Sequence, residues 1–324
     1  MVKVLITGGT GFIGFHLLKH LLKQGHELTI IDNFFRSEID RYFSEYASQI
    51  KLVVMDLTKP LADHPELDDH YEIVFHLAAI NGVKYANQIP AKVLRTNILA
   101  TINLLDWCEQ IKPRSLLFAS SSEVYNGALN DLDYSVPTIE TLPIVLGDLN
   151  NPRNSYSASK IIGESLITNY AKSAGINSRI VRYHNIYGPR MGRDHVIPEL
   201  ISRIHQKENP FKLYGADQTR AFCYVQDAVE ATADIAFLQN KKHITVNIGN
   251  ANEEIKIMDL CKKIFKLHDY AASIEELPAP PGSPDRRSPS TSKLEAYIGF
   301  KPRVSLDEGL LETYKWYKEN LALT

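Results

Sequence analysis

Residues 2–14 read VKVLITGGTGFIG, and this stretch decides the fold. A short apolar run leads directly into glycines, and a helical pattern of apolar residues follows from Phe12 to Gln24. The glycines at positions 9, 11 and 14 give the spacing G-x-G-x-x-G between the expected strand and the expected helix. Glycine permits a tight turn and a close backbone approach to a pyrophosphate, and the helix start offers unpaired N–H groups. The stretch therefore predicts the first βα turn of a dinucleotide-binding sheet.

An acidic residue follows at the spacing that such a turn requires. The second apolar run, residues 28–31, closes on Asp32. A carboxylate there accepts hydrogen bonds from a ribose 2′-OH and repels a 2′-phosphate, so the position favours NAD over NADP. Asp56 follows the third expected strand, residues 51–55, where an adenine ring could meet it.

The ends of the next strands carry small or polar residues. HLAA at 76–79 ends the fourth strand, and its alanines let a cofactor lie close. His76 itself is expected to be structural, and Asn97 in the following helix is expected to order the core through its amide. The fifth strand runs into ASSSEVY at 119–125, so a hydroxyl stands at the carboxyl edge where open α/β sheets bind ligands.

Strands and helices alternate along the first 185 residues. The expected strands end at residues 6, 31, 55, 77, 119 and 183, with helices at 93–110 and 155–173 before the last two. The strands are apolar nearly throughout, which indicates helices on both faces of a parallel sheet. After Ile186 the pattern loosens, with helices at 227–238, 258–267 and 306–320 and a strand at 245–248 that returns to the sheet. A Pro- and Ser-rich stretch, 277–292, is either a flexible linker or an ordered loop over a ligand.

The fold class predicted is α/β: a Rossmann-type doubly wound parallel sheet with a smaller C-terminal α/β substrate domain. Residues 1–185 are expected to form the NAD-binding domain, with 226–250 returning to it, and 186–225 with 251–324 the substrate domain.

Composition excludes several classes of protein. The chain has 324 residues, is 44% hydrophobic and has a net charge of −2, which gives no reason to expect nucleic acid or a membrane surface as partner. Its 3 cysteines are widely spaced, so neither a disulfide framework nor a cysteine zinc site is expected. No apolar run approaches the ~18 residues of a membrane span. We expect a cytoplasmic protein without a metal.

Tyr156 and Lys160 lie four residues apart on one face of an expected helix. A free phenol has a pKa of about 10, which must fall towards neutrality before the group can act as a base. A lysine cation beside it, together with a positively charged nicotinamide, acts in that direction. The pair is informative because it follows a dinucleotide fingerprint.

These residues together resemble the extended short-chain dehydrogenase/reductases of the nucleotide-sugar epimerase/dehydratase family, over essentially the whole chain. The resemblance is carried by Thr7–Gly14, His76–Ala79, Ser121 with Val124–Tyr125, Tyr156 with Lys160, RYHNIYGPR at 182–190, Tyr214–Gly215, TRAF at 219–222 and NIGN at 247–250. It implies a tightly held NAD and the transient oxidation of C4 of a nucleotide-linked sugar.

By this resemblance Tyr156 is the base, Lys160 tunes it and holds the ribose, and Ser121 binds the C4 oxygen. The cofactor set it implies is Gly8, Gly11, Phe12, Ile13, Gly14, Asp32, Asn33, Asp56, Leu57, Leu77, Ala78, Ala79, Asn97, Tyr156, Lys160 and Tyr183. For the substrate, the resemblance implies that Asn185 contacts the diphosphate and that Arg220 and Arg287 bind the phosphates or a sugar substituent. It places the base and its ribose between two short stretches, His195–Val196 and Lys212–Tyr214. Ser122 is also included among the substrate residues.

Glu123 bears on which reaction follows. Once C4 is a ketone, C5–H becomes acidic and a C5 carboxylate becomes labile, so a carboxylate at Glu123 could act as base or proton relay. The stretch 143–153 and RSPS at 287–290 are similar to the decarboxylase domain of the bacterial polymyxin-resistance enzyme, and UDP-glucuronate decarboxylases carry Ser-Glu at this place. Decarboxylation of a UDP-glucuronate-type substrate is the first expectation. Dehydration and then 4-epimerisation stay open.

Two further alternatives concern activity and assembly. A non-catalytic NAD-binding sensor predicts loss of the tyrosine, the lysine or the hydroxyl, and all three are present. In the family that the chain resembles, the helices near 93–110 and 155–173 form a four-helix dimer interface, so a homodimer is expected. Apolar residues of these helices such as Leu105, Trp107, Ile167 and Tyr170 are more often core than interface.

Overall fold

The structure, a computed structural model, describes residues 1–62, 64–132, 134–239, 241–280 and 282–320. The chain divides into two compact units. The first comprises Met1–Val124, Leu146–Arg182 and Val229–Val246, and the second Tyr125–Val145, Tyr183–Ala228 and Asn247–Thr324.

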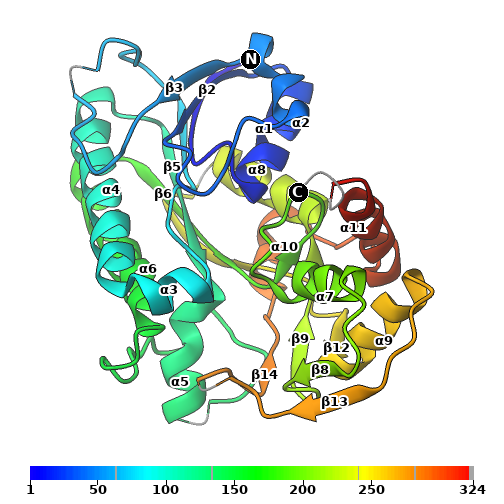
Figure 1. Cartoon of the computed structure of the whole chain (residues 1–324). Helices are drawn as coiled ribbons and strands as arrows, with labels where there is room; N and C mark the ends of the chain where they lie inside the picture. Colours follow the sequence, from blue (N-terminus) through cyan, green and yellow to red (C-terminus); the bar gives the residue numbers. More distant parts are fainter. Residues whose placement is uncertain (63, 133, 240, 281, 321–324) are drawn as a thin grey trace. The chain divides into compact units, whose positions relative to one another are not determined.

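A seven-stranded sheet organises the first unit (Figure 1). Its strands are β1 (Lys3–Thr7), β2 (Glu27–Asp32), β3 (Lys51–Val54), β4 (Ile73–His76), β5 (Ser115–Ser121), β6 (Asn177–Tyr183) and β11 (His243–Ile248). They lie in the order β11-β6-β5-β4-β1-β2-β3, and β1 pairs in parallel with both β2 and β4. The order reverses between β1 and β4, which is the switch point where doubly wound sheets bind their ligands. The predicted fold class is confirmed, including the return of residues 245–248 to the sheet.

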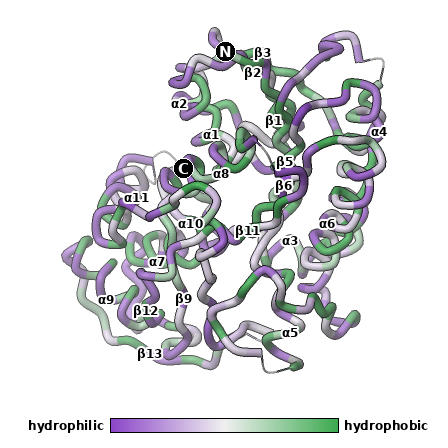
Figure 2. The backbone as a smooth tube through the Cα atoms, turned by 180° about the vertical axis from the view of Figure 1, so that it is seen from behind, coloured by the Kyte–Doolittle hydropathy of each residue, from purple (hydrophilic) through white to green (hydrophobic). Residues whose placement is uncertain are grey.

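Helices cover both faces of this sheet, as the apolar strands require. They are α1 (Phe12–Lys23), α2 (Arg41–Ser44), α3 (Val83–Gln88), α4 (Pro90–Ile111), α6 (Asn154–Ala174) and α8 (Val225–Phe237), with a 3₁₀ turn at Ala47–Gln49. Helices α4 and α6 pack side by side on one face, and α1 lies on the other (Figure 1). Figure 2 shows the neighbouring strands β1 and β2 as hydrophobic segments.

The apolar residues of α4 and α6 belong mainly to the core. Leu105, Trp107 and Ile167 are buried with the sheet residues Leu5 and Val74 in one hydrophobic cluster. Full burial of one such side chain is worth about 1.5–3 kcal/mol. These residues therefore stabilise the first unit from within.

The second unit is built from small sheets and short helices. Its strands are β7 (Ile186–Tyr187), β8 (Phe211–Tyr214), β9 (Thr219–Ala221), β10 (Cys223–Tyr224), β12 (Glu254–Lys256), β13 (Ile274–Leu277) and β14 (Arg286–Arg287). Its helices are α5 (Asn126–Asp131), α7 (Val196–His205), α9 (Ile257–Leu267), α10 (Ser292–Ile298) and α11 (Leu306–Asn320), and a 3₁₀ turn at Ser122–Tyr125 precedes α5. The sheets are β10-β7, β12-β9-β14 and β13-β8.

The Pro- and Ser-rich stretch, residues 277–292, is described by the structure except for Pro281. Its described part forms regular contacts. Arg286 and Arg287 form β14, in parallel register with Thr219 and Arg220 of β9. Its far end binds Thr138, whose N–H donates to Ser288 O at 3.0 Å. Thr138 belongs to Tyr125–Val145, a segment of the second unit.

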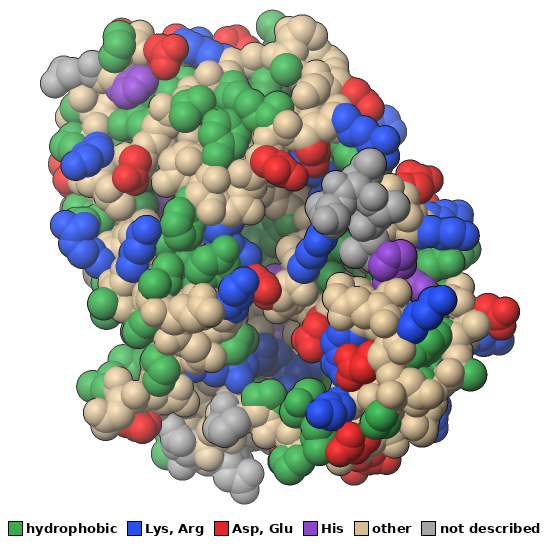
Figure 3. All heavy atoms as spheres, viewed as in Figure 1, with side chains coloured by type: hydrophobic (Ala, Val, Ile, Leu, Met, Phe, Trp, Pro, Cys, Tyr) green, Lys and Arg blue, Asp and Glu red, His purple; other side chains and the backbone are tan. Residues whose placement is uncertain are grey.

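The surface carries charges of both signs. Figure 3 shows blue and red side chains interspersed over the viewed face, in keeping with the net charge of −2. Among the described residues, we find no helix with the length and apolar character needed to traverse a bilayer.

Candidate active site

Two glycines of the first βα turn are required by the packing of the protein itself. Gly8 has φ +73°, and a Cβ on it would lie 2.7 Å from the backbone of Ala78. A Cβ on Gly14 would lie 2.3 Å from Gly8 O. The turn is thus closed tightly against the end of β4, at the switch point of the sheet.

Gly11 is different, because the protein leaves space around it. A Cβ there would meet only Gly8 O, at 3.4 Å. Gly11 is also the N-cap of α1, and no side chain caps that helix. A glycine with space beside it and a helix start with uncapped N–H groups fit a pyrophosphate, so Gly11, Phe12, Ile13 and Gly14 suit NAD.

Asp32 ends β2 beside this turn. Its carboxylate accepts hydrogen bonds from the N–H groups of Thr10 (3.2 Å) and Phe34 (3.0 Å) and from the Ser37 hydroxyl (3.4 Å). A carboxylate has about four lone-pair sites, so capacity for a ribose hydroxyl remains. The neighbouring Asn33 side chain accepts from Phe35 N, at 3.1 Å.

The loop after β4 is ordered by a buried amide. Asn97 accepts from Ile80 N (2.8 Å) and donates to Ile80 O and Ser159 Oγ (both 3.0 Å). Both N–H bonds of this amide are used within the protein, so Asn97 positions the loop of Leu77, Ala78 and Ala79. Its assignment to the cofactor set stays a prediction.

His76 is structural, as predicted. It is buried, its ring nitrogens lie 2.8 Å from Thr7 Oγ1 and 3.1 Å from Thr101 Oγ1, and burial lowers its pKa to about 3. Further along the sheet edge, the exposed carboxylate of Asp56 accepts from Thr58 N at 2.9 Å, and Leu57 is buried.

Helix α6 brings Tyr156 and Lys160 to the carboxyl end of β5. Lys160 Nζ donates to Ala119 O at 2.7 Å and lies 5.8 Å from the centroid of the Tyr156 ring. Burial lowers the pKa of Lys160 to about 7, while the nearby Glu164 carboxylate raises it. The expected pair is therefore assembled in the first unit.

The electrostatics of Tyr156 differ from the expectation. Burial raises the pKa of Tyr156, and the negative charge of Glu123 raises it further. A hydrogen bond with the Ser121 side chain and the positive charge of Arg36 lower the pKa of Tyr156, but burial outweighs both. The protein groups alone thus hold the phenol protonated. The positive nicotinamide of a bound NAD is needed to bring its pKa down.

Glu123 lies beside this group and is held by an arginine. Arg153 Nη2 lies 3.9 Å from Glu123 Oε1, and the two side chains are 15% and 19% exposed. Arg153 precedes α6, in the stretch that the sequence singled out. Ser122 beside Glu123 is buried. The structure therefore brings Ser121, Glu123, Arg153, Tyr156 and Lys160 together.

A buried triad behind Lys160 was not anticipated from the sequence. Arg182 forms two hydrogen bonds to Glu164, at 2.9 and 2.7 Å, and the Ser120 hydroxyl donates to Glu164 at 2.5 Å. The available signal was the spacing, because Glu164 stands four residues after Lys160 on the same helical face. Arg182 lies in the buried run of β6, which ends at Tyr183.

Apart from Ser122, the residues assigned to the substrate fall in the second unit, where β8, β9 and β14 present several of them. Lys212 and Tyr214 share the exposed face of β8, which alternates buried and exposed residues. Arg220 and Arg287 are register partners on β9 and β14. Arg287 is 8% exposed and donates to Asn126 Oδ1 at 2.9 Å.

Other contacts fix these strands. Asn185 has φ 42° and donates to Ala221 O at 3.0 Å, next to Arg220. His195 and Val196 begin α7, which is tied to β8 by a hydrogen bond from Arg203 to Lys212 O.

Arg286, the sequence neighbour of Arg287, does not join this group. Its guanidinium binds Glu254 at 2.7 and 2.9 Å and Val136 O at 3.0 Å. This ion pair lowers the pKa of Glu254 to about 2. Arg286 therefore links β14 to Glu254 of β12 and has a structural role.

A family model described as "NAD dependent epimerase/dehydratase family" matches residues 4–249. The UDP-N-acetyl-alpha-D-glucosaminuronate decarboxylase of Bacillus cytotoxicus is 36% identical over 328 residues, covering 98% of each chain. UDP-glucuronic acid decarboxylase 1 of Arabidopsis thaliana is 32% identical over 315 residues, covering 95% of this chain and 68% of that protein.

Among solved structures, the UDP-glucuronic acid 4-epimerase from Bacillus cereus, in complex with UDP-glucuronic acid and NAD, superposes with a TM-score of 0.83. It is 28% identical in sequence, and the match covers 98% of this chain and 99% of that one.

Proposed function

This chain belongs to the NAD-dependent epimerase/dehydratase family, and from that premise we propose that it is a decarboxylase of a UDP-linked hexuronate. The expected family, fold and NAD cofactor are confirmed. The observation that carries the proposal is the carboxylate of Glu123, held by Arg153 beside Tyr156. A 4-epimerase has no evident use for that carboxylate, and two relatives are named as decarboxylases of UDP-linked uronic acids.

The first step requires Tyr156, Lys160 and Ser121. When bound, NAD supplies the hydride acceptor for C4 of the sugar. Tyr156 takes the proton of the C4 hydroxyl, and Ser121, which hydrogen-bonds with Tyr156, holds the same oxygen. Lys160 holds the ribose and supplies positive charge beneath the phenol.

The second step uses Glu123. With C4 a ketone, the bond from C5 to its carboxylate breaks, CO₂ leaves, and the electron pair flows towards the C4 oxygen. Ser121 and Tyr156 stabilise the charge that develops there. Glu123 relays a proton to C5, and Arg153 keeps its carboxylate oriented. The hydride then returns to C4 and Tyr156 gives its proton back to the C4 oxygen, so the net change is the loss of CO₂.

We assign the first unit to NAD and the second to the nucleotide sugar. Arg220 and Arg287 stand in register on adjacent strands, and guanidinium groups suit a diphosphate or a sugar carboxylate. Lys212 and Tyr214 on the exposed face of β8 suit the base and its ribose. Asn185, His195 and Val196 complete the proposed set.

Assembly as a homodimer is part of the proposal. Ile162 on α6 is 39% exposed, although the other apolar residues of that helix face the core or lie half-buried. Sedimentation equilibrium measures the mass directly. A mass of one chain at micromolar concentration contradicts the dimer.

The test of function is incubation with UDP-glucuronate and with UDP-N-acetylglucosaminuronate, read by mass. Decarboxylation removes about 44 Da and dehydration about 18 Da, whereas epimerisation leaves the mass unchanged. Glu123→Gln is expected to abolish CO₂ release and keep NAD binding. A variant that still releases CO₂ at the wild-type rate removes Glu123 from the mechanism.

The second candidate is a UDP-glucuronate 4-epimerase, which the Bacillus cereus structure favours. The same incubation separates the two. A new isomer of unchanged mass, formed without CO₂, selects the epimerase.

A further inference from the structure

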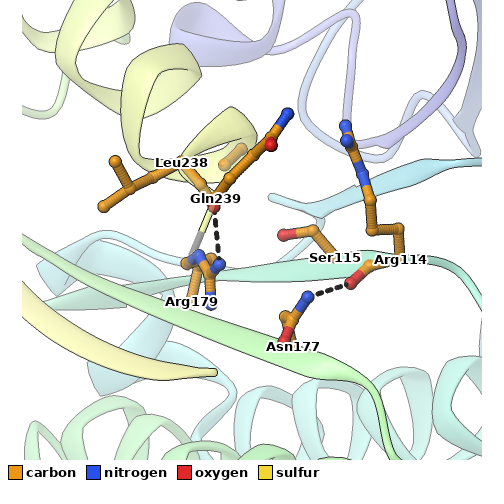
Figure 4. Close-up of a pocket in the computed structure, with 7 residues that line it drawn as sticks. Arg114, Ser115, Asn177, Arg179, Leu238 and Gln239 are labelled. Carbon is orange, nitrogen blue, oxygen red and sulfur yellow. Dashed lines mark hydrogen bonds between the residues drawn. The ribbon is translucent and has the colours of Figure 1, made fainter. Parts of the chain in front are cut away.

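A cavity of about 270 Å³ lies at the amino end of the sheet in the first unit. It is lined by Arg114, Ser115, Asn177, Arg179, Ala236, Leu238 and Gln239 (Figure 4). Ser115 begins β5 and Asn177 begins β6, whereas the catalytic groups follow the other end of β5. Since a strand rises about 3.3 Å per residue, the seven residues of β5 separate the cavity from Ser121 by roughly 20 Å.

Arg179 is a buried cation in the wall of this cavity, 1% exposed. It donates to the carbonyls of Ile235 (3.1 Å) and Leu238 (2.9 Å) at the end of α8, and to those of Ser178 (3.1 Å) and Lys242 (2.9 Å). These four bonds use four of the five N–H donors of a guanidinium and leave one on Nη2. All four partners are neutral carbonyls, so within the described chain its charge is offset only by the end of the helix.

Arg114 adds a second positive charge. Among the described residues its guanidinium forms no hydrogen bond or ion pair, although its backbone carbonyl accepts from Asn177 Nδ2 at 2.9 Å. The charge of Arg114, after burial, contributes to lowering the pKa of Arg179 to about 10. The two guanidinium groups are thus close enough to repel one another, and Arg179 keeps its charge at neutral pH.

Ser115 supplies an independent sign of a ligand. It is 2% exposed, and in the described structure its hydroxyl has no hydrogen-bond partner. Figure 4 shows this hydroxyl pointing from β5 into the space beside Arg179. A buried hydroxyl without a partner is unfavourable by about 1–3 kcal/mol in general, so it is expected to serve an acceptor that enters the cavity.

We propose that this cavity is a second binding site, separate from the active site, for a small molecule that carries a phosphate monoester or free phosphate. A phosphate group carries a charge of about −1.5 to −2 at neutral pH, which matches two guanidinium charges better than a carboxylate does. The remaining N–H of Arg179, the fork of Arg114 and the hydroxyl of Ser115 supply donors for its oxygens. Leu238 and the amides of Asn177 and Gln239 also line the cavity and could contact the organic part of a small ligand. The cavity volume lies just below the ~300–1,000 Å³ of ordinary ligand pockets, so the ligand would be small. The proposal does not depend on the reaction catalysed at the other edge.

The test is a titration of the protein with inorganic phosphate, AMP and acetate by calorimetry, in saturating NAD and UDP. Those two compounds occupy the cofactor and nucleotide sites, which would otherwise bind phosphate. Hydrogen exchange locates the effect, because phosphate is expected to slow exchange at the starts of β5 and β6 and at the end of α8. AMP binding tighter than phosphate identifies an organic phosphate, and the reverse order identifies the free ion.

Arg114→Ala is the first variant, because its exposed side chain makes no contact that the described fold needs. Phosphate affinity is expected to fall about tenfold or more, as for loss of a charged hydrogen bond. Ser115→Ala should also weaken binding. The matched control is Lys172→Ala, which removes an exposed positive charge near His243, outside the cavity lining, and should bind like the wild type.

Three results overturn the proposal. One is the absence of saturable phosphate binding in the presence of NAD and UDP. Another is an equal loss of affinity in Arg114→Ala and Lys172→Ala, which would mean diffuse attraction to a positive surface. The third is acetate binding as tight as phosphate, which contradicts a site for a doubly charged group.

Discussion

The two ends of the central sheet each bury a cation, Lys160 near the end of β5 and Arg179 near the start of β6. Among the described residues both donate to backbone carbonyls, Lys160 to that of Ala119 and Arg179 to four. Burial lowers the pKa of Lys160 to about 7 and that of Arg179 only to about 10. The end that carries the proposed active site therefore holds a cation that can titrate near neutrality, and the other end holds a permanent one.

The charges that surround the two cations also differ. A carboxylate, Glu164, lies behind Lys160 and is itself neutralised by Arg182. Beside Arg179 the nearby charge that acts on its pKa is a second arginine, Arg114. At the Lys160 end, the positive and negative charges balance within the protein, and Glu164 shifts the pKa of Lys160. At the Arg179 end there is an excess of positive charge, which a bound anion would neutralise.

The largest expected effect in this comparison is that of Tyr156→Phe. Loss of a positioned general base lowers kcat by about 10²–10⁴-fold. The ring and its packing stay, so folding and NAD binding should persist. Steady-state kinetics on the substrate identified by mass measures the loss, and NAD fluorescence quenching is the control. A variant with wild-type kcat would show that another group takes the C4 proton.

Glu164→Gln is expected to reduce both stability and the working pH range. Breaking one side of a buried ion pair is unfavourable by about 3–5 kcal/mol, which urea unfolding measures. Glu164 raises the pKa of Lys160, so its loss lowers that pKa further. Protonated Lys160 then persists only to lower pH, and the high-pH limb of kcat/KM should move to lower pH.

A structural role alone would leave that limb in place. The double variant Glu164→Gln with Arg182→Met removes the uncompensated arginine and should recover part of the stability, while the shifted limb remains. A limb that returns to its wild-type position with the recovered stability would contradict tuning of Lys160 by Glu164.

Arg179→Met is expected to be next in size. The variant leaves carbonyls at the end of α8 without their donor, and each buried acceptor left unsatisfied is unfavourable by about 1–3 kcal/mol. Because Arg179 lies at the far end of the sheet, kcat at saturating substrate should change less than twofold. Thermal unfolding with parallel kinetics checks both statements. A large loss of kcat in a protein that remains folded would show that the two ends are coupled.

The first unit was largely predictable because its signals are local. Each signal lies within a short stretch of sequence: an apolar strand followed by glycines, or Tyr156 and Lys160 four residues apart. Such a signal can be recognised without knowing which distant residues it will contact. Arg286 shows why the second unit was not. Its strand β14 has two residues and no periodicity, and it exists because β9 lies beside it. Whether Arg286 or Arg287 faces a protein carboxylate depends on the distant Glu254.

The same limit applies to the buried pairs. Glu164 and Arg182 are 18 residues apart in the chain, on a helix and a strand whose packing brings them together. Arg114 and Arg179 stand before β5 and within β6, at positions that no motif marks. The pattern of residues predicts which elements form. The contacts between elements decide which of their charged groups are neutralised.

The smallest expected effect is that of Arg114→Ala on stability without ligand. Arg114 has no partner among the described side chains, so the free energy of unfolding should change by less than about 0.5 kcal/mol, as for ordinary surface substitutions. Removing its charge also relieves the repulsion that helps to lower the pKa of Arg179, so any change should be a gain, larger at low salt. Urea unfolding at about 20 and 500 mM salt measures this, since charge effects are screened at the higher value. A loss of stability that persists at high salt would mean that Arg114 stabilises the fold. A gain in stability confined to low salt would mean that the charge of Arg114 is uncompensated in the protein without ligand, as the proposed anion site requires.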